Sequence, residues 1–301
     1  MANERGGFGG PVLVTGATGF IGRHLCDRLV SAGADVHAVV RAASSSGANL
    51  AGVTTHTVHD ATAEFATVST VVRPVVIFHL ATRFAQKHHP TAISQMVDAN
   101  VTFGAAVADA AVRGHARMVH ATSAWQHYAG SDYSPVSLYA ATKQALCDVI
   151  QYFAEMEGLV ADEVCLFDTY GPRDPRQKLV WLLLEHAASG APLPMSSGHQ
   201  LVDLTHVEDV VSAFVGVATA TPLGGRLVAR SGHPITVREL TALVERVSGR
   251  PINAQWDLRP ARGREMDQDW IVPGVSTSWR PRIDLQSGVA DLWTEEVSRR
   301  A

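Results

Sequence analysis

Tyr139 and Lys143 stand four positions apart in SPVSLYAATKQA, residues 134–145, and their side chains suit proton transfer. In an α-helix, positions i and i+4 lie on one face, so the phenol and the ammonium are expected to face one ligand together. A free phenol has a pKa of about 10, but a neighbouring ammonium favours the phenolate. The pair therefore predicts a tuned acid/base, although this spacing alone is common by chance.

Ser123 supports this interpretation of the pair, because it ends a predicted strand, RMVHATS, that leads to the predicted helix. Its hydroxyl can hydrogen-bond an oxygen that gains or loses a proton beside a nicotinamide, while Tyr139 transfers the proton and Lys143 holds the ribose. Asn100, on the preceding predicted helix, either anchors a water or backbone group behind Lys143 or makes a local bond to its own backbone. Together these residues predict a hydride-transfer site.

A dinucleotide site is indicated by TGATGFIG, residues 15–22. Its glycines follow an apolar segment and open a predicted helix, where missing side chains let the backbone approach a pyrophosphate at the positive helix end. The GxxGxxG spacing differs from the usual GxGxxG, and the alternative is a tight turn that serves packing only, so the context carries the prediction. The expected contacts are Gly16, Thr18, Gly19, Phe20, Ile21 and Gly22.

The choice between dinucleotides depends on the end of the second predicted strand. There AVVRAASSS offers Arg41 and a serine-rich loop, whereas an NAD site usually offers a carboxylate to the ribose 2′-hydroxyl. Arg41 can hold a 2′-phosphate, so the sequence favours NADP and leaves NAD possible; alternatively Arg41 is a solvated loop residue. Asp60, after the third strand, either accepts a hydrogen bond from the adenine amino group or caps a turn.

Strands and helices that alternate along the chain must position these residues. Helices are predicted at 20–33 and 91–112, and a flexible loop at 42–48. Strands are predicted at 11–16, 34–40, 53–60, 74–82 and 117–123. This alternation is typical of a doubly wound α/β fold, a parallel sheet covered by helices on both faces.

The character of the sequence changes after Tyr170, where prolines and glycines interrupt the alternation. We assign 1–170 and 201–230 to a dinucleotide-binding Rossmann domain, and 171–200 and 231–301 to a smaller C-terminal α/β substrate lobe. Two capping boxes, THVE at 205–208 and TVRE at 236–239, predict helix starts.

Composition favours a small-molecule ligand over nucleic acid. The 301 residues carry 29 acidic and 25 basic side chains, a formal charge of −4, without the clustered Lys and Arg that phosphate backbones attract. The N-terminus lacks the apolar run of a signal peptide, and no segment stays apolar over the roughly 18 residues of a membrane span. We therefore expect a cytoplasmic protein that binds neither nucleic acid nor membrane.

The thiol and imidazole side chains favour neither a disulfide nor a metal site. Cys26, Cys147 and Cys165 are odd in number and lie in apolar stretches, which predicts three buried thiols in a reducing compartment. The histidines in KHHP, residues 87–90, form no i, i+4 helical pair and have no CxxC partner, so no metal is expected.

The chain resembles the extended branch of the short-chain dehydrogenase/reductase family, the NAD-dependent epimerase/dehydratases, which act largely on nucleotide-activated sugars. The motifs that carry the resemblance span nearly the whole chain: TGATGFIG, VVIFHLAT, NVTFG, TSAWQHY, YAATK, YGPRDP and VDLTHVEDVV. SAWQHY and YSPVSLYAATKQA are most similar to bacterial sugar-nucleotide 4-ketoreductases and to synthases of deoxyhexoses and dideoxyhexoses. The resemblance implies a Rossmann domain with a smaller substrate lobe, and a homodimer packed through the tyrosine-bearing helix and its neighbour.

The same resemblance implies roles for individual residues. Ser123, Tyr139 and Lys143 would be the catalytic trio, and Asn100 would complete a tetrad. Cofactor contacts are also implied for the end of the predicted fourth strand, at Leu80, Ala81 and Thr82.

Departures from the family pattern bear on the reaction. Family members that dehydrate a hexose carry an Asp-Glu pair after the catalytic hydroxyl, where this chain has Ala124 and Trp125, so 4,6-dehydration is not expected. The family's substrate-holding Asn is Asp168, which cannot donate a hydrogen bond when ionised. The Arg that often precedes the Asp of an RDF motif is Val202. The usual diphosphate grip is therefore in doubt.

Candidate substrate-binding residues follow from these gaps and from loop positions. Arg83, with Gln86 or Lys87, follows the fourth strand at the carboxyl end of the sheet, where ligands sit. Trp125 and His127 either line a hexose pocket or pack ordinarily. Replacements for the diphosphate grip, each alternatively a surface residue, are Arg173, Lys178, Arg262 and Arg264.

Three functions fit the sequence. The first is an NADPH-dependent reductase acting on the C4 ketone of a dTDP- or CDP-linked 4-keto-deoxyhexose, in which Tyr139 donates the proton. The second is a 4-epimerase that oxidises and re-reduces the same carbon with a retained cofactor, for which NAD is the usual choice. The third is a non-catalytic nucleotide sensor, which would have no reason to keep the trio together. Arg41 favours the reductase.

Overall fold

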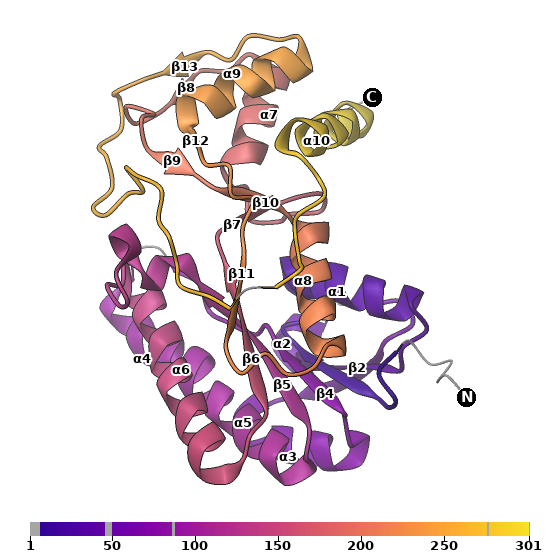
Figure 1. The fold of residues 1–301 in the computed structure, drawn as a ribbon. Coiled ribbons are helices and arrows are strands. Elements are labelled where there is room, and N and C mark those ends of the chain that lie inside the picture. Colours follow the sequence, from indigo (N-terminus) through magenta and orange to yellow (C-terminus); the bar gives the residue numbers. More distant parts are fainter. Residues whose placement is uncertain (1–6, 46–49, 86–87, 276, 301) are drawn as a thin grey trace.

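A seven-stranded sheet forms the centre of the molecule (Figure 1). The computed structural model describes residues 7–45, 50–85, 88–275 and 277–300. Every neighbouring pair of strands in this sheet is parallel, which confirms the predicted doubly wound α/β fold. The strand order is β3 (Thr54–Val58), β2 (Val36–Arg41), β1 (Val12–Thr15), β4 (Val76–His79), β5 (Arg117–Ser123), β6 (Ala161–Leu166), β11 (Arg226–Ala229).

Helices cover both faces of the sheet because side chains alternate along each strand. In β1, Val12 and Val14 join one buried cluster, whereas Leu13 joins another on the opposite face. The first cluster lies under α1 (Phe20–Ser31) and α8 (Val207–Thr219). The second lies under α3 (Ala61–Val72), α5 (Phe103–Gly114) and α6 (Leu138–Glu157).

The helix predicted at 91–112 is present but interrupted. A 3-10 turn at Pro90–Ala92 leads into α4 (Ile93–Val97), and a π-helical turn at Asp98–Thr102 separates α4 from α5. Turns of this kind often mark functional sites. Here the π-turn contains Asn100.

Two local predictions were wrong. The stretch expected as a flexible loop begins with a short helix, α2 (Ala42–Ser45), and the rest of it, 46–49, lies outside the described residues. The predicted capping box at Thr205 does not form, because Thr205 belongs to β10 (Leu204–His206) and the His206 ring accepts the Glu208 backbone N–H instead. The box at Thr236 is confirmed and opens α9 (Val237–Ser248).

A separate buried cluster lies among the elements drawn at the top of Figure 1. It includes side chains of α7 (Leu179–Ser189), α9 and α10 (Leu285–Arg300). Short two-stranded pairings accompany it: β7 (Asp168–Tyr170) with β10, β8 (Leu193–Pro194) with β13 (Ala254–Gln255), and β9 (Leu201–Val202) with β12 (Ile235–Thr236). The domain boundaries given above stay a prediction.

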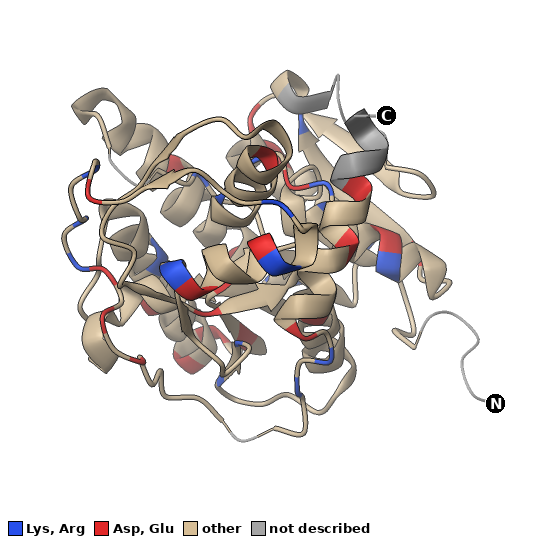
Figure 2. Cartoon of the chain, turned by 90° about the horizontal axis from the view of Figure 1, so that it is seen from above, with Lys and Arg blue, Asp and Glu red and all other residues tan. Residues whose placement is uncertain are grey.

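Figure 2 shows basic and acidic segments interspersed along the ribbon. The three cysteines are free; Cys26 and Cys165 are buried, whereas Cys147 is half-buried and so less enclosed than predicted. Among the described residues, no helix has the length and apolar character needed to cross a membrane.

Candidate active site

The turn after β1 touches the end of β4, at the carboxyl edge of the sheet. Gly16 has a φ of +73°, and a Cβ there would lie 2.6 Å from the Ala81 nitrogen and 2.7 Å from the Leu80 carbonyl carbon. The Leu80 N–H also donates to the Thr15 carbonyl at 3.2 Å. Only glycine permits this approach, which places the predicted cofactor residues of both segments side by side.

The glycine turn leaves the first turn of α1 open. Gly19 is the N-cap residue and offers no side chain to the amides that follow it, and a Cβ on Gly22 would lie 2.1 Å from the Gly16 carbonyl oxygen. Side chains are therefore excluded at Gly16 and Gly22, and a Cβ on Gly19 would lie 3.1 Å from the Gly16 carbonyl oxygen. The first backbone N–H groups of α1 receive no bond from a capping side chain, and together with the positive end of the helix dipole they fit the pyrophosphate of a dinucleotide.

Ser123 ends β5 and caps a 3-10 turn, Ala124–Gln126. The hydroxyl accepts the Trp125 backbone N–H at 3.3 Å, and the Gln126 side-chain oxygen accepts the Ser123 N–H at 3.0 Å. The hydroxyl proton is not used by either bond. Ser123 is thus held in place with a donor available to a substrate oxygen.

Tyr139 and Lys143 lie one turn apart on α6, which begins after Ser137. Burial raises the pKa of Tyr139 to about 12, against smaller lowering effects from a hydrogen bond with Thr82 and the charge of Arg176. The predicted lowering of this pKa by Lys143 is therefore not realised. Lys143 is 2% exposed, its Nζ donates to the Ala121 carbonyl at 3.0 Å, and burial lowers its pKa to about 8.

Asn100 ties the segment after β4 to α6. Its Oδ1 accepts the Thr82 hydroxyl at 3.0 Å and the Arg83 N–H at 2.6 Å, and its Nδ2 donates to the Arg83 carbonyl at 3.1 Å and to the Thr142 hydroxyl at 2.9 Å. Of the two alternatives considered, the structure has the anchoring one and not a bond to its own backbone. Because Thr82 also bonds Tyr139, Asn100 helps to position the phenol.

The two residues predicted to read the adenosine end lie on neighbouring elements. Arg41 is exposed at the end of β2, opposite Val58 of β3. Asp60 caps α3 and accepts the backbone N–H groups of Thr62 and Ala63 at 3.0 and 3.1 Å. Asp60 therefore has the capping role that was the alternative to binding adenine.

The residues predicted to bind the diphosphate of the substrate lie in different parts of the structure. Lys178 Nζ lies 3.7 Å from an Asp168 carboxylate oxygen and 5.6 Å from the centre of the Phe84 ring, so Lys178 links Asp168 to the segment that follows β4. Arg173 instead pairs with Asp27 on α1 at 2.8 Å.

The remaining candidates lie in three different loops, which follow β4, β5 and β13. Arg264 donates to the Ser134 hydroxyl and, at 2.7 Å, to the Pro135 carbonyl, near the start of α6. Its neighbour Arg262 is exposed. His127 is buried, with Nδ1 on the carbonyls of the loop that follows it, and Arg83 is exposed. Gln86 and Lys87 lie outside the described residues.

Two residues beside the trio were missed by the sequence analysis. The Phe84 ring lies 5.0 Å from the Tyr139 ring and 5.8 Å from that of Trp125. The Arg176 guanidinium lies 4.3 Å over the Phe20 ring, in the first turn of α1, and is held by Asp174. Phe84 lies in the loop after the fourth strand, which the sequence analysis did propose as a substrate-binding segment. Nothing in the sequence distinguishes Arg176 from its neighbour Arg173.

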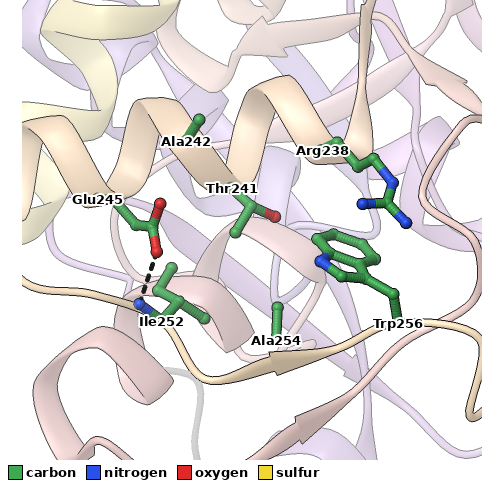
Figure 3. Close-up of a pocket in the computed structure, with 7 residues that line it drawn as sticks. All are labelled: Arg238, Thr241, Ala242, Glu245, Ile252, Ala254 and Trp256. Atoms are coloured by element: carbon green, nitrogen blue, oxygen red, sulfur yellow. Dashed lines mark hydrogen bonds between the residues drawn. The ribbon is translucent and has the colours of Figure 1, made fainter.

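A further cavity, of about 230 Å³, lies elsewhere (Figure 3). It is lined by Arg238, Thr241, Ala242, Glu245, Ile252, Ala254 and Trp256, on α9 and around β13. None of the predicted site residues lines it.

Known proteins resemble the chain along nearly its full length. CDP-abequose synthase of Salmonella typhimurium is 22% identical over 93% of this chain and 96% of its own. UDP-glucose 4-epimerase of Mycolicibacterium smegmatis is 26% identical over 92% and 96%. The structure of UDP-glucose 4-epimerase from Thermotoga maritima, with UDP-glucose, superposes with a TM-score of 0.85 at 19% identity, over 97% of this chain and all of that one.

The sequence model of one family matches residues 12–227, which hold the glycine cradle, Ser123, Tyr139 and Lys143. This match covers well over half of the chain and agrees with the resemblance seen in its motifs. The chain belongs to the NAD dependent epimerase/dehydratase family.

Proposed function

We propose that this protein reduces the C4 ketone of a nucleotide-activated 4-keto-deoxyhexose, a dTDP- or CDP-linked sugar, with NADPH. The observation that carries the proposal is that Tyr139 and Lys143 lie one turn apart on α6 and that Lys143 bonds Ala121 of β5, the strand that ends at Ser123. The reduced nicotinamide would supply the hydride to C4. The family and its sugar-nucleotide relatives support the substrate class.

In this proposal each residue of the trio has one task. Ser123 donates its unused hydroxyl proton in a hydrogen bond to the C4 oxygen, and Tyr139 gives that oxygen a proton as the new hydroxyl forms. Lys143 holds the ribose. A pKa of about 12 keeps Tyr139 protonated at neutral pH, which suits a proton donor in a reduction more than a base in an oxidation.

The neighbours of the trio support a ketoreductase over a dehydratase. Loss of water from a hexose needs a second acid/base pair at the sugar, and the positions after Ser123 hold Ala124, which is buried, and Trp125, which packs against Phe84. Neither side chain can act as a general acid or base near neutral pH.

The proposal of NADPH rests on Arg41. Its exposed guanidinium at the end of β2 can pair with a 2′-phosphate, and no carboxylate ends this strand. NAD is the alternative, since the family's description names it.

We further propose a homodimer and a cytoplasmic location. Exposed apolar side chains on α4 and α6 offer the contact surface, among them Ile93, Val97, Tyr152 and Met156. Three free thiols suit a reducing compartment.

A 4-epimerase is the second candidate, and the UDP-glucose 4-epimerases among the relatives favour it. The two are separated by incubating the protein with NADPH, or NADH in parallel, and a dTDP-4-keto-6-deoxyhexose. Loss of NADPH absorbance in proportion to product, abolished in Tyr139→Phe, supports the reductase. The epimerase is tested in a parallel incubation with UDP-glucose, which has a C4 hydroxyl, and inversion at C4 without net change in cofactor absorbance supports it. No change of the ketone with either cofactor contradicts the proposed substrate.

A further inference from the structure

Phe84 presents apolar surface beside the proposed proton donor. Its ring meets the Tyr139 ring edge-on, at 5.0 Å between centres and 75° between planes, and lies 5.8 Å from the Trp125 ring. Phe84 nevertheless remains 47% exposed. A large aromatic side chain that packs on the reactive phenol and keeps half its surface open is placed to contact whatever binds there.

The backbone next to Phe84 is fixed. The preceding residue, Arg83, bonds Asn100 through both its N–H, at 2.6 Å, and its carbonyl, at 3.1 Å. Asn100 is 1% exposed and also bonds Thr142 of α6, the helix that carries Tyr139. The aromatic ring and the phenol are therefore held to the same framework, so the ring acts as a wall of the site.

The ammonium group that lies over the Phe84 ring is already paired with a carboxylate. Lys178 lies over the Phe84 ring, 5.6 Å from its centre, and is also 3.7 Å from the carboxylate of Asp168. A substrate carboxylate would have to compete with Asp168 for this ammonium. A substrate hydroxyl directed at the ring would lose its hydrogen bonds to water and gain none from the ring.

We propose that Phe84 and Trp125 form a wall that selects a sugar deoxygenated at C3 or at C6, the positions on the two sides of the C4 centre. This inference rests on the proposed function. When the C4 oxygen meets Tyr139, the C3 side or the C5 side of the ring faces Phe84, because both are attached to C4. The carbon on that side is then a methylene at C3 or the methyl group at C6, in preference to a hydroxylated carbon or a carboxylate.

The inference predicts a graded binding series. Nucleotide sugars that share one base would be titrated calorimetrically into the protein saturated with oxidised cofactor: the glucose, 6-deoxyglucose, 3-deoxyglucose and glucuronate forms. We expect one deoxy form to bind on the order of 10- to 100-fold more tightly than glucose, and glucuronate to bind most weakly. The deoxy form preferred identifies the side that faces Phe84.

Matched variants assign the preference to the wall. Phe84→Leu keeps an apolar side chain and should keep most of the preference, whereas Phe84→Gln should reduce it to within about threefold. Circular dichroism confirms that both variants fold. Equal affinity for all four sugars, or a preference that survives in Phe84→Gln, would overturn the inference and leave the proposed function standing. Failure of every sugar nucleotide to bind would overturn both.

Discussion

The buried ammonium group of Lys143 lowers the free energy of unfolding, so replacing Lys143 should stabilise the protein. Its ammonium is buried, and burial lowers its pKa from 10.5 to about 8. Since one pKa unit corresponds to about 1.4 kcal/mol, the charged form costs about 3 kcal/mol in the folded protein at neutral pH. Removing the ammonium also leaves the Ala121 carbonyl without its hydrogen bond, which reduces this gain in stability by about 1 kcal/mol. Lys143→Met should therefore stabilise the cofactor-free protein by about 2 kcal/mol at neutral pH.

The pH dependence of this gain follows from the direction of the shift. Below about pH 8 Lys143 is protonated in both the folded and the unfolded chain, so the cost is present in full. Between about 8 and 10.5 the unfolded chain binds more protons than the folded one, and the free energy of unfolding of the wild type rises with pH. The advantage of Lys143→Met should therefore shrink across that window.

Urea denaturation of the cofactor-free proteins, at about pH 7 and again at about pH 9.5, tests this account. Lys178→Met serves as the control, because Lys178 is only partly buried and pairs with Asp168, so its removal should bring no comparable gain. The reasoning is refuted if Lys143→Met is less stable than the wild type at neutral pH, or if its advantage does not change with pH.

Three further predictions concern the cofactor and the framework of the site. Arg176→Ala should weaken NADPH binding roughly 10-fold in a fluorescence titration, because it removes the guanidinium over the first turn of α1. An equal loss in Arg173→Ala, whose side chain pairs with a carboxylate of α1, would contradict this. Arg41→Asp should lower NADPH affinity about 100-fold and NADH affinity far less, and an unchanged ratio of the two affinities would argue against a 2′-phosphate contact. Asn100→Leu should lower the free energy of unfolding by about 2 to 4 kcal/mol, since it strands the backbone N–H and carbonyl of Arg83. Chemical denaturation measures this loss, and wild-type stability would show that other partners replace these bonds.

The sheet and its glycine turn could be predicted because their signals are local. Apolar runs of strand length recur at the spacing of strand–helix units, and a glycine triplet directly after the first run fixes where the turn must be. Strand β5 was predicted with its observed bounds, Arg117–Ser123, because this short segment lies between two predicted helices.

Features that depend on contacts between distant segments could not be predicted. Thr205 and Thr236 both precede a glutamate by three residues, but pairing of β10 with β7 places Thr205 in a strand. Arg173 and Arg176 are alike in sequence, and only the folded loop directs one towards Asp27 and the other over Phe20.

The pKa values of Tyr139 and Lys143 could not be predicted from the sequence either. Spacing on a helix predicts that Tyr139 and Lys143 share a face, and it says nothing of how deeply each is buried. In the fold, burial raises the pKa of the phenol to about 12 and lowers that of the ammonium to about 8. Desolvation is the largest cause of both shifts, and the attraction between ammonium and phenolate on which the prediction relied is not among the causes for either residue.

The measurement that tests the central proposal most directly is the fate of the hydride. The protein would be incubated with a dTDP-4-keto-6-deoxyhexose and NADPH deuterated at the transferred position, and the product examined by mass spectrometry and NMR. We predict that the product carries one deuterium at C4, and that Tyr139→Phe forms no product. Recovery of the ketone without deuterium, together with inversion at C4 of a 4-hydroxy sugar nucleotide that keeps a deuterium placed at its own C4, would contradict the reductase and show that the hydride is returned within the site.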